Sequence, residues 1–380
     1  MIDDINDDID ALIDELNATG APGIRPSPRA LRLEPLLAEV ARRNGSDLLL
    51  IAGSVPGIRI DGTVVRLEGP VLDGGDIEEL VVPELPSHAA RQYRETGSAD
   101  ASLRFAELGR FRANLHHERG RAAAAIRVLP VRVPRLSDLA LPPEVAALSS
   151  LGRGLVLIGG ATGAGKTTTM AALIDDINRR DAKHIITVED PIEYEHQHER
   201  SLVEQVEIGP DAADFPTALR SAVRQAPDVL VIGEMRDPES MRIALSAAET
   251  GHLVLSSLHT TDVASTIGRI CDSFPNERQN TIRQELSLAL SAVLTQTLVP
   301  RNGGGRVPAV ELLMVSYGAR QHIRKNALQH LHQEMSLTRR QGSVTLEDSL
   351  ARLVRAGLIT PADAMARAGH PDELDSILRV

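Results

Sequence analysis

The chain has 380 residues, of which 42% are hydrophobic and 24% charged, the balance of a soluble globular protein long enough for two domains. A single cysteine excludes an internal disulfide framework and any cysteine-rich zinc site. The net charge of −11, no Trp and only three Tyr argue against a nucleic-acid partner. No apolar run approaches the roughly 20 residues of a membrane span and the N-terminus is acidic, so a cytoplasmic protein is expected, reaching the inner membrane only through partners.

Residues 1–30 are predicted to form an acidic amphipathic arm followed by a flexible linker. Apolar residues recur at helical spacing between acidic ones, at Ile2, Ile5, Ile9, Leu12, Ile13 and Leu16. The following stretch, "NATGAPGIRPSPR", has the Gly and Pro density of a tether. Two interpretations have equal weight: a short solvated helix, or a docking arm that lays its apolar stripe on a partner.

Residues 31–130 are predicted to form a small α+β domain. Strand-like pieces such as "DLLLIAG", "SLRFAELGRFRANLHH" and "AAAAIRVLP" alternate with helix-like "LEPLLAEVARRNG" and "GGDIEELVVPEL". The Pro-rich, extended composition that follows predicts an interdomain linker over residues 131–149.

Residues 150–380 are predicted to form an α/β core with a mostly parallel sheet. Four short apolar runs, "GLVLIGG", "HIITVED", "DVLVIGE" and "HLVLSSL", are separated by helical stretches, which is typical of a sheet with helices on its faces. From about residue 276 the chain is expected to be helical to its end, including "IRQELSLALSAVLTQTL". Thr345 and Thr360 are placed to cap two of these helices.

A phosphate-binding loop is predicted at the start of this core. The stretch "GATGAGKT" fits the pattern G-x-x-x-x-G-K-[ST] between a strand and a helix. Its glycines let backbone N–H groups point at phosphate oxygens, Lys166 can reach the β- and γ-phosphates, and the Thr167 hydroxyl can ligate Mg²⁺. The expected ATP-binding residues are Gly160, Ala161, Thr162, Gly163, Ala164, Gly165, Lys166, Thr167 and Thr168.

Carboxylates follow two of the predicted strands. "ITVEDPIEYE" supplies Glu189, Asp190 and Glu193, and "VLVIGEMRD" supplies Glu234. Ligands of parallel sheets lie beyond the carboxyl ends of the strands, so these groups should face the same crevice as the loop. Glu193 and Glu234 are the catalytic candidates: one carboxylate can help Thr167 to hold Mg²⁺ while the other orients water, with the assignment left open. Glu195 and Asp237 are interpreted as solvated turn residues.

Two histidines, His252 and His259, bracket the strand "LVLSSL". A lone histidine is more often structural than catalytic, but a pair around one strand suggests a sensor of the nucleotide state. Metal ligation is not expected, because no further ligand has suitable spacing.

The order of these stretches strongly resembles the secretion-superfamily ATPases, ring-forming motors of type IV pili and of type II and IV secretion. "GATGAGKTT", "TVEDPIEYEH", "PDVLVIGEMRD" and "AAETGHLVLSSLHTTDVASTIGRI" match that family's Walker A motif, Asp box, Walker B motif and His box. The likeness is greatest to the PilT-like twitching-motility branch, which powers pilus retraction. The extension and type II secretion ATPases usually carry a four-cysteine insert that one cysteine cannot supply.

The resemblance implies a homohexamer of RecA-like cores with ATP and Mg²⁺ bound between subunits. It also implies a PAS-like first domain whose arginines reach the nucleotide, here Arg112, Arg119 and Arg127, while Arg110 and Arg121 are expected to solvate a strand face. It favours Glu234 as the Walker B carboxylate. The implied partners are a pilus platform protein of the inner membrane and a paralogous ATPase.

The chain departs from the retraction branch near its C-terminus. Retraction motors carry the segment "AIRNLIRE", and the aligned residues of this chain, 318–325, read "GARQHIRK". Arg320, Ile323 and Arg324 are shared, whereas Lys325 reverses a charge. The alternatives are therefore an extension or secretion ATPase and an accessory ring subunit. A RecA-like helicase is disfavoured by the acidic composition.

Overall fold

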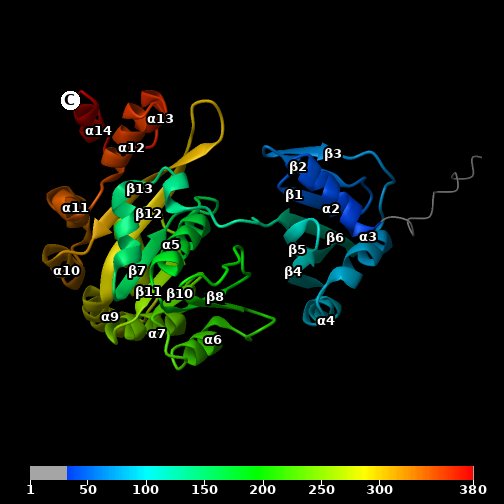
Figure 1. Cartoon of the computed structure of the whole chain (residues 1–380), viewed down its shortest axis with the longest axis horizontal. Helices are drawn as coiled ribbons and strands as arrows, with labels where there is room; N and C mark the ends of the chain where they lie inside the picture. The colour runs from blue at the N-terminus through cyan, green and yellow to red at the C-terminus, as the bar shows by residue number, and fades with distance from the viewer. Residues whose placement is uncertain (1–31, 380) are drawn as a thin grey trace, which may run out of the picture. The chain divides into compact units, whose positions relative to one another are not determined.

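The computed structural model describes residues 32–379, which form two compact units, one ending at Leu129 and the other beginning at Pro130 (Figure 1). The predicted acidic arm lies outside the described residues. Among the helices of residues 32–379, none combines the length and the apolar character that crossing a bilayer requires.

The first unit is built on a six-stranded antiparallel sheet in the order β3-β2-β1-β6-β5-β4. Its strands are β1 (Asp47–Ile51), β2 (Gly57–Ile60), β3 (Thr63–Arg66), β4 (Ser98–Phe105), β5 (Gly109–Glu118) and β6 (Arg121–Val128). Its helices are α2 (Leu33–Arg42), α3 (Gly74–Val81) and α4 (Ser87–Thr96), which contact β1, β6 and β4 respectively. The α+β prediction for this part of the chain is confirmed.

Local sequence explains the hairpin at the edge of this sheet. Asp61 and Gly62 join β2 to β3 with φ values of 49° and 84°, and an Asp-Gly pair tolerates these left-handed conformations in a two-residue turn. The sheet's core is apolar: Leu37, Phe111 and Ile126 are among its fully buried residues. Burial of these side chains joins the helices to the sheet.

The second unit contains a seven-stranded sheet in the order β13-β12-β7-β11-β10-β8-β9. The strands are β7 (Gly154–Gly159), β8 (His184–Glu189), β9 (Leu202–Glu207), β10 (Val229–Ile232), β11 (Leu253–Leu258), β12 (Leu290–Pro300) and β13 (Arg306–Met314). All neighbouring pairs are parallel except β12 and β13. This confirms the predicted RecA-like core with a mostly parallel sheet.

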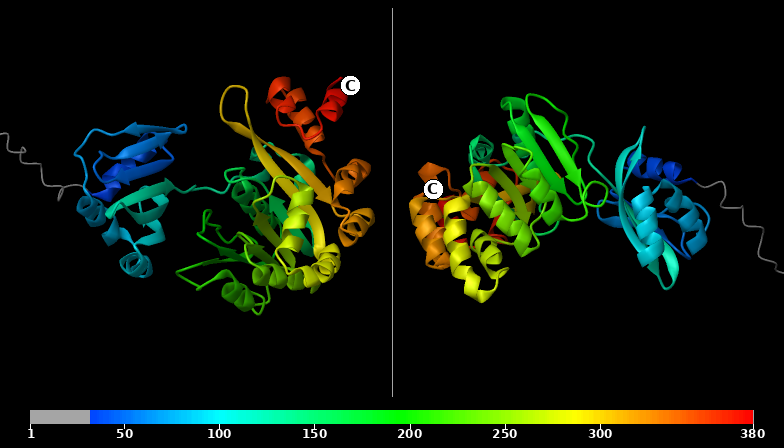
Figure 2. Two further views of the ribbon diagram at one scale, coloured as in Figure 1. Left: turned by 180° about the vertical axis from the view of Figure 1, so that it is seen from behind. Right: turned by 90° about the horizontal axis from the view of Figure 1, so that it is seen from below.

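Helices cover both faces of this sheet (Figure 2). The helices of this unit are α5 (Lys166–Arg180), α6 (Phe215–Ala222), α7 (Pro238–Glu249), α8 (Val263–Asp272), α9 (Asn276–Ala289), α10 (Tyr317–Arg324), α11 (Leu331–Leu337), α12 (Leu346–Arg355), α13 (Pro361–Met365) and α14 (Pro371–Leu378). Val156 and Ile158 point to the face that α5 covers, whereas Leu155 and Leu157 point to the face of α6 to α9. Both faces of the strands are apolar for this reason.

Two strands contradict the prediction that the chain is helical from residue 276 onward. Helix α9 ends at Ala289, and β12 then pairs in parallel with β7 and antiparallel with β13. The β-branched residues Val293, Thr295 and Thr297 suit a strand, and the open edge of β7 supplies ladder hydrogen bonds that a helix would forgo. An apolar run of this composition fits the helical and the extended period alike, and the strand neighbours decide the outcome.

The predicted interdomain linker, residues 131–149, is in part packed. The 3₁₀ helix η4 (Pro143–Ser150) contacts α5, and Val145 and Leu148 are fully buried in the core on that face of the sheet. Arg180 donates to the carbonyl oxygen of Ser149 over 2.7 Å. The Pro-rich composition predicts an extended linker and does not indicate that these apolar side chains are buried.

The C-terminal helices form a small core of their own beside the far end of the β12–β13 hairpin (Figure 1). Val299 and Val307 of the hairpin meet Leu350 and Leu374 of the helices there. The side chains of Thr345 and Thr360 accept from the N–H groups of Asp348 and Asp363, so the two predicted helix caps are confirmed.

Candidate active site

Four strand ends meet at one edge of the second sheet. Parallel pairing sets Gly159 beside Leu258 and Ile232 beside Val188, so the residues that follow β7, β11, β10 and β8 leave the sheet on the same side. The phosphate loop follows β7, Glu234 follows β10 and His259 follows β11, while Glu189 is the last residue of β8. The topology therefore gathers the loop, the carboxylates and His259 at one edge.

The phosphate loop leaves β7 and enters α5 through left-handed glycines. Gly163 and Gly165 have φ values of 77° and 87°, which residues with a Cβ rarely adopt. Ala161, Thr162 and Gly163 are exposed, while Ala164 is buried. The turn leaves backbone N–H groups and the N-terminus of α5 available to anionic oxygens.

Gln296 on β12 contacts this loop through its side chain. The sequence motifs did not indicate this residue. Its Nε2 donates to the carbonyl oxygen of Ala164 over 2.6 Å, and its Oε1 accepts from the Thr169 hydroxyl over 2.8 Å. A Cβ on Gly160 would lie 2.7 Å from the Gln296 carbonyl oxygen, and one on Gly165 would lie 2.7 Å from Nε2. The close approach requires glycine at both positions. The alternation in "LTQTL" would have indicated a strand, and hence Gln296, had it not been assigned to a helix.

Lys166 is folded back onto the loop. Its Nζ donates to the carbonyl oxygens of Gly160 and Ala161 over 2.7 and 3.1 Å, and only 7% of the residue is exposed. Burial lowers the pKa of this ammonium group, although the negative charges of Glu234 and Glu193 oppose the shift. Both candidate catalytic carboxylates are therefore near enough to act electrostatically on the lysine.

The threonines of the motif differ in their surroundings. Thr167 lies half-buried in the first turn of α5. The Thr168 hydroxyl is 3.0 Å from the hydroxyl of Tyr194, a buried residue of the Asp-box stretch. The latter contact joins the loop to that stretch, so the structure gives Thr168 a packing partner in addition to its predicted place at the nucleotide.

His259 connects the lysine to Glu234. Its Nδ1 lies 3.4 Å from Lys166 Nζ and 3.4 Å from the Thr162 hydroxyl, and its Nε2 lies 3.3 Å from Glu234 Oε1. Nδ1 therefore faces the lysine and the threonine hydroxyl, whereas Nε2 faces the carboxylate. One imidazole thus touches the phosphate loop and the Walker B strand.

Glu234 remains ionised although it is half-buried. Burial raises the pKa of this carboxyl group, but the hydrogen bond from Arg236, 2.7 Å away, and the nearby His259 outweigh burial and lower the pKa. A charged carboxylate at this edge suits a divalent cation or a polarised water molecule.

The Asp-box residues divide between burial and exposure. Burial raises the pKa of Glu189, whose Oε1 accepts from Thr187 and Gln205 over 2.7 and 3.1 Å. Asp190 is exposed and near enough to Arg236 to raise the pKa of that residue. Glu193 is half-buried on the following turn. Asp237, interpreted as a solvated turn residue, is half-buried and caps α7 by accepting from the Ser240 N–H, so it has a structural role at the start of that helix.

His252 lies at the opposite end of β11 from His259. Its Nδ1 is 2.9 Å from the Ala247 carbonyl oxygen. It lines a separate pocket of about 500 Å³ together with Arg220, Arg224 and Arg242. The two histidines of the predicted sensor are therefore not brought together, and only His259 reaches the phosphate loop.

The predicted arginines of the first unit lie on β5, β6 and their turn. Arg112 and Arg127 are cross-strand partners, so two like charges stand side by side. Arg127 donates to Asp47 over 2.8 Å, and Arg59, missed in the sequence, lies 3.5 Å from the same carboxylate. Arg119, in the turn, is the most exposed of these side chains at 81%.

These features define the class of protein. A strand, a glycine-rich phosphate loop and a helix, with lysine, threonine and two carboxylates at one sheet edge, fit Mg²⁺ and a nucleoside triphosphate. The donor set is oxygen-rich and anionic, as Mg²⁺ prefers. The second unit is that of a P-loop nucleoside triphosphatase.

Comparison with known proteins identifies the family. Residues 124–342 match the model of the type II/IV secretion system protein family. The type IV pilus retraction ATPase PilT of Pseudomonas aeruginosa is 39% identical over 89% of this chain and 98% of its own length. A twitching motility protein of Neisseria gonorrhoeae is 38% identical over 85% and 87%. The chain belongs to the type II/IV secretion system protein family and is an ATPase.

A solved structure agrees over the same extent. The crystal structure of the pilus retraction motor PilT with bound ADP superposes with a TM-score of 0.83, 42% identity and coverage of 91% of this chain and 99% of that one. The predicted fold class is shown by this match, from the N-terminal α+β unit to the C-terminal helices.

Proposed function

We propose that the chain is a Mg²⁺-dependent ATPase motor that assembles as a homohexamer in the cytoplasm and drives retraction of type IV pili. The observation that carries the ATPase chemistry is the contact of His259 with both Lys166 and Glu234. The similarity to pilus retraction ATPases over nearly the whole chain supports the mechanical task.

The residues divide the chemistry among themselves. Lys166 exchanges the carbonyl oxygens of Gly160 and Ala161 for phosphate oxygens, which offer a full negative charge in their place. Thr167, Glu193 and Glu234 are the residues that would hold Mg²⁺, which would neutralise charge on the phosphates. Glu234 or Glu193 orients the attacking water, and His259 reports the loss of the terminal phosphate through its contact with Lys166.

The arginines of the first unit supply positive charge to nucleotide held by a neighbouring subunit. Arg112 and Arg127 lie side by side, so their positive charges repel each other and an anion bound between them would relieve that repulsion. Burial raises the pKa of Asp47, but the hydrogen bond from Arg127 helps to outweigh burial and the Asp47 pKa is lowered. Each candidate has a carboxylate neighbour: Arg127 has Asp47 at 2.8 Å, Arg119 has Glu118 at 3.0 Å, and Arg112 has Asp100 at 3.7 Å, the longest of the three.

Helix α10 supports retraction despite its altered sequence. The shared Arg320 and Arg324 bond to the end of α9, at the Leu288 carbonyl oxygen over 2.9 Å and the Ser287 hydroxyl over 2.8 Å. The shared Ile323 is fully buried. Of the differing residues, Ala319 is fully buried, His322 is half-buried and Lys325 is exposed. The shared residues fix the helix to α9, and the divergent ones favour, as second candidate, an accessory ring subunit beside a paralogous ATPase.

The test begins with purified protein. Lys166→Ala should reduce ATP turnover at least about 100-fold, since the side chain stabilises transferring charge. Lys183→Ala is the matched control, because that lysine lies beside Asp181 and directly before β8, at the opposite end of the strand from Glu189. Turnover by Lys166→Ala at the wild-type rate would contradict the site.

The mechanical role is tested in the host. Deletion should leave excess surface pili and abolish twitching, and a Glu234→Gln gene should not restore it. Loss of pili would identify an extension or secretion ATPase, while excess pili rescued by Glu234→Gln would identify an accessory subunit. The inner-membrane platform protein is the expected partner, and DNA is not expected to stimulate turnover.

A further inference from the structure

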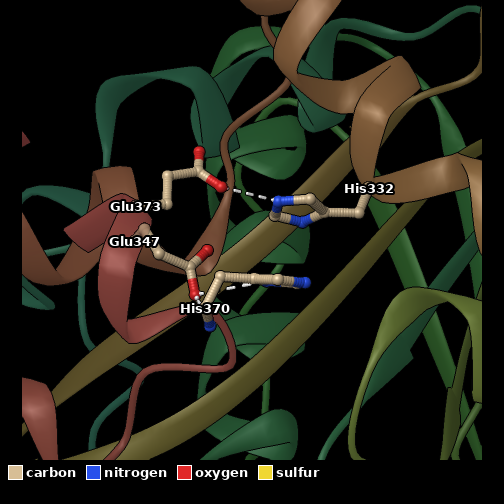
Figure 3. Close-up of side chains that lie close together, drawn as sticks. All are labelled: His332, Glu347, His370 and Glu373. Carbon is tan, nitrogen blue, oxygen red and sulfur yellow. Dashed lines mark hydrogen bonds and ion pairs between the residues drawn. The ribbon is translucent and has the colours of Figure 1, made fainter. Parts of the chain in front are cut away.

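Two histidines and two glutamates gather in the C-terminal helices, outside the nucleotide site. His332 comes from α11, Glu347 from the first turn of α12, and His370 and Glu373 from the start of α14 (Figure 3). One ligand atom from each residue lies within 4.8 Å of the ligand atoms of the other three. Segments far apart in the sequence thus present metal-binding atoms to one point.

The side chains are already in mutual contact. His332 Nε2 is 2.8 Å from Glu373 Oε2, and the rings of His332 and His370 stack with centroids 3.8 Å apart. The backbone N–H of His370 donates to Glu347 Oε1 over 2.8 Å, and His370 Nδ1 lies 3.7 Å from the same oxygen. Figure 3 shows the imidazoles and carboxylates facing one another.

The second oxygen of Glu347 is the anomaly in this cluster. The Glu347 side chain is 1% exposed, and its Oε2 has no hydrogen-bond partner among residues 32–379. A carboxylate oxygen withdrawn from water without a partner is costly, and such atoms in native proteins call for an ion, a water molecule or a proton. Its neighbours are imidazoles and another carboxylate, which are metal ligands.

We propose that His332, Glu347, His370 and Glu373 form a structural site for a divalent transition-metal ion of the Zn²⁺ class. Two imidazole nitrogens and two carboxylate oxygens form a four-ligand set that Zn²⁺ accepts, and the two carboxylates balance its charge. Zn²⁺ ligands at 2.0–2.2 Å lie roughly 3.4 Å apart in a tetrahedron, so the ligand atoms, now within 4.8 Å of one another, would draw closer on binding. Because the His332 and His370 rings are stacked, at least one ring would also turn to direct its in-plane lone pair at the metal.

Neighbouring groups orient these ligands. Arg339 donates to Glu373 Oε1 over 3.1 Å, leaving Oε2 to face the cluster. The His370 N–H holds Glu347 Oε1 in the same way and leaves Oε2 free for the metal. Hydrogen bonds of this kind fix ligand orientation in known sites. Mg²⁺ prefers six oxygen ligands, so this site is chemically distinct from the one at the phosphate loop.

The consequence is a cross-link between α11, α12 and α14. The core beneath α12 to α14 is small, with Leu350, Leu353 and Leu374 as its largest buried helical residues. Small helical units with such cores gain stability from a bound metal, because binding occurs only in the folded state.

The test uses the full chain without an affinity tag, stripped by a chelator and titrated with Zn²⁺. We expect one tightly bound Zn²⁺ per chain by metal analysis and a rise in the melting temperature that Mg²⁺ does not reproduce. Glu347→Gln and His370→Ala should each weaken Zn²⁺ binding about 100-fold or more and remove the rise. His330→Ala, which removes an exposed histidine near the cluster, is the matched control and should behave as wild type.

The melting temperatures of the zinc-free proteins distinguish a variant that misfolds from one that has only lost the metal site. Glu347→Gln keeps the size of the side chain and an oxygen that can accept from the His370 N–H, so without metal it should melt no lower than the stripped wild type. Lys166→Ala should bind Zn²⁺ normally, which makes this result independent of the nucleotide site. Absence of binding by the wild type, equal binding by Glu347→Gln, or loss of binding in His330→Ala would overturn the proposal.

Discussion

Replacing Gln296 by methionine tests whether β12 holds the phosphate loop in its binding conformation. The change keeps the length of a side chain that is 6% exposed but removes both of its hydrogen bonds, 2.6 Å to the Ala164 carbonyl oxygen and 2.8 Å from the Thr169 hydroxyl. A buried polar group left unpaired costs about 1–3 kcal/mol. The expected loss in the free energy of unfolding is therefore about 2–4 kcal/mol for the two groups.

Nucleotide affinity should fall with stability. In the wild type, the two hydrogen bonds of Gln296 favour the binding conformation of the loop. If their loss removes about 1.4 kcal/mol of that preference, the affinity for ATP falls about tenfold. The assays are urea unfolding of the full chain and titration with a fluorescent ATP analogue. Thr169→Val removes only one of the two bonds, so it should cost about 1 kcal/mol and leave the affinity unchanged. Thr297→Val, the next position on the strand, is the control.

The decisive outcome is a split between the two assays. If Gln296→Met loses stability while binding the analogue as tightly as wild type, the loop does not depend on this clamp and the reasoning is wrong.

Two further predictions concern stability. Burial lowers the pKa of His196 from 6.5 to about 4, so the unfolded chain binds more protons between these values and stability falls as the pH drops through this window, by roughly 3 kcal/mol at most. His196→Leu should flatten that dependence in urea titrations between pH 7 and 4.5, and an unchanged pH profile would show that His196 is not buried neutral. The two-pronged ion pair of Arg352 with Glu144, at 2.6 and 2.7 Å, joins α12 to η4 while remaining part-exposed, so Arg352→Met should cost about 1 kcal/mol. Added salt should shrink that cost, and a loss that persists in high salt would point to packing.

The sequence was most informative where chemistry and topology constrain the same residues. The run from Gly154 to Lys166 encodes a strand, a turn and a helix start, and the strand-end rule then located Glu189 and Glu234 at the same edge. Strand β12 was missed, because an apolar run with sparse polar residues fits helical and extended periods alike and only the free edge of β7 decides between them.

Contacts between distant residues could not be read from the sequence. Gln296 meets Ala164 across 132 positions, and nothing in either local stretch encodes the pairing. The same holds for Asp47, which lies between Arg59 and Arg127 through strand register alone. The separation of His252 from His259 follows from the length of β11, which places its two flanking residues at opposite edges of the sheet.

Strand β12 also has a structural consequence. Gln296 grips the phosphate loop, and Val299, three positions further on, is buried beneath the C-terminal helices. One strand therefore contacts both the nucleotide-binding loop and the core of the C-terminal helices, so the two parts of this unit share a continuous backbone connection.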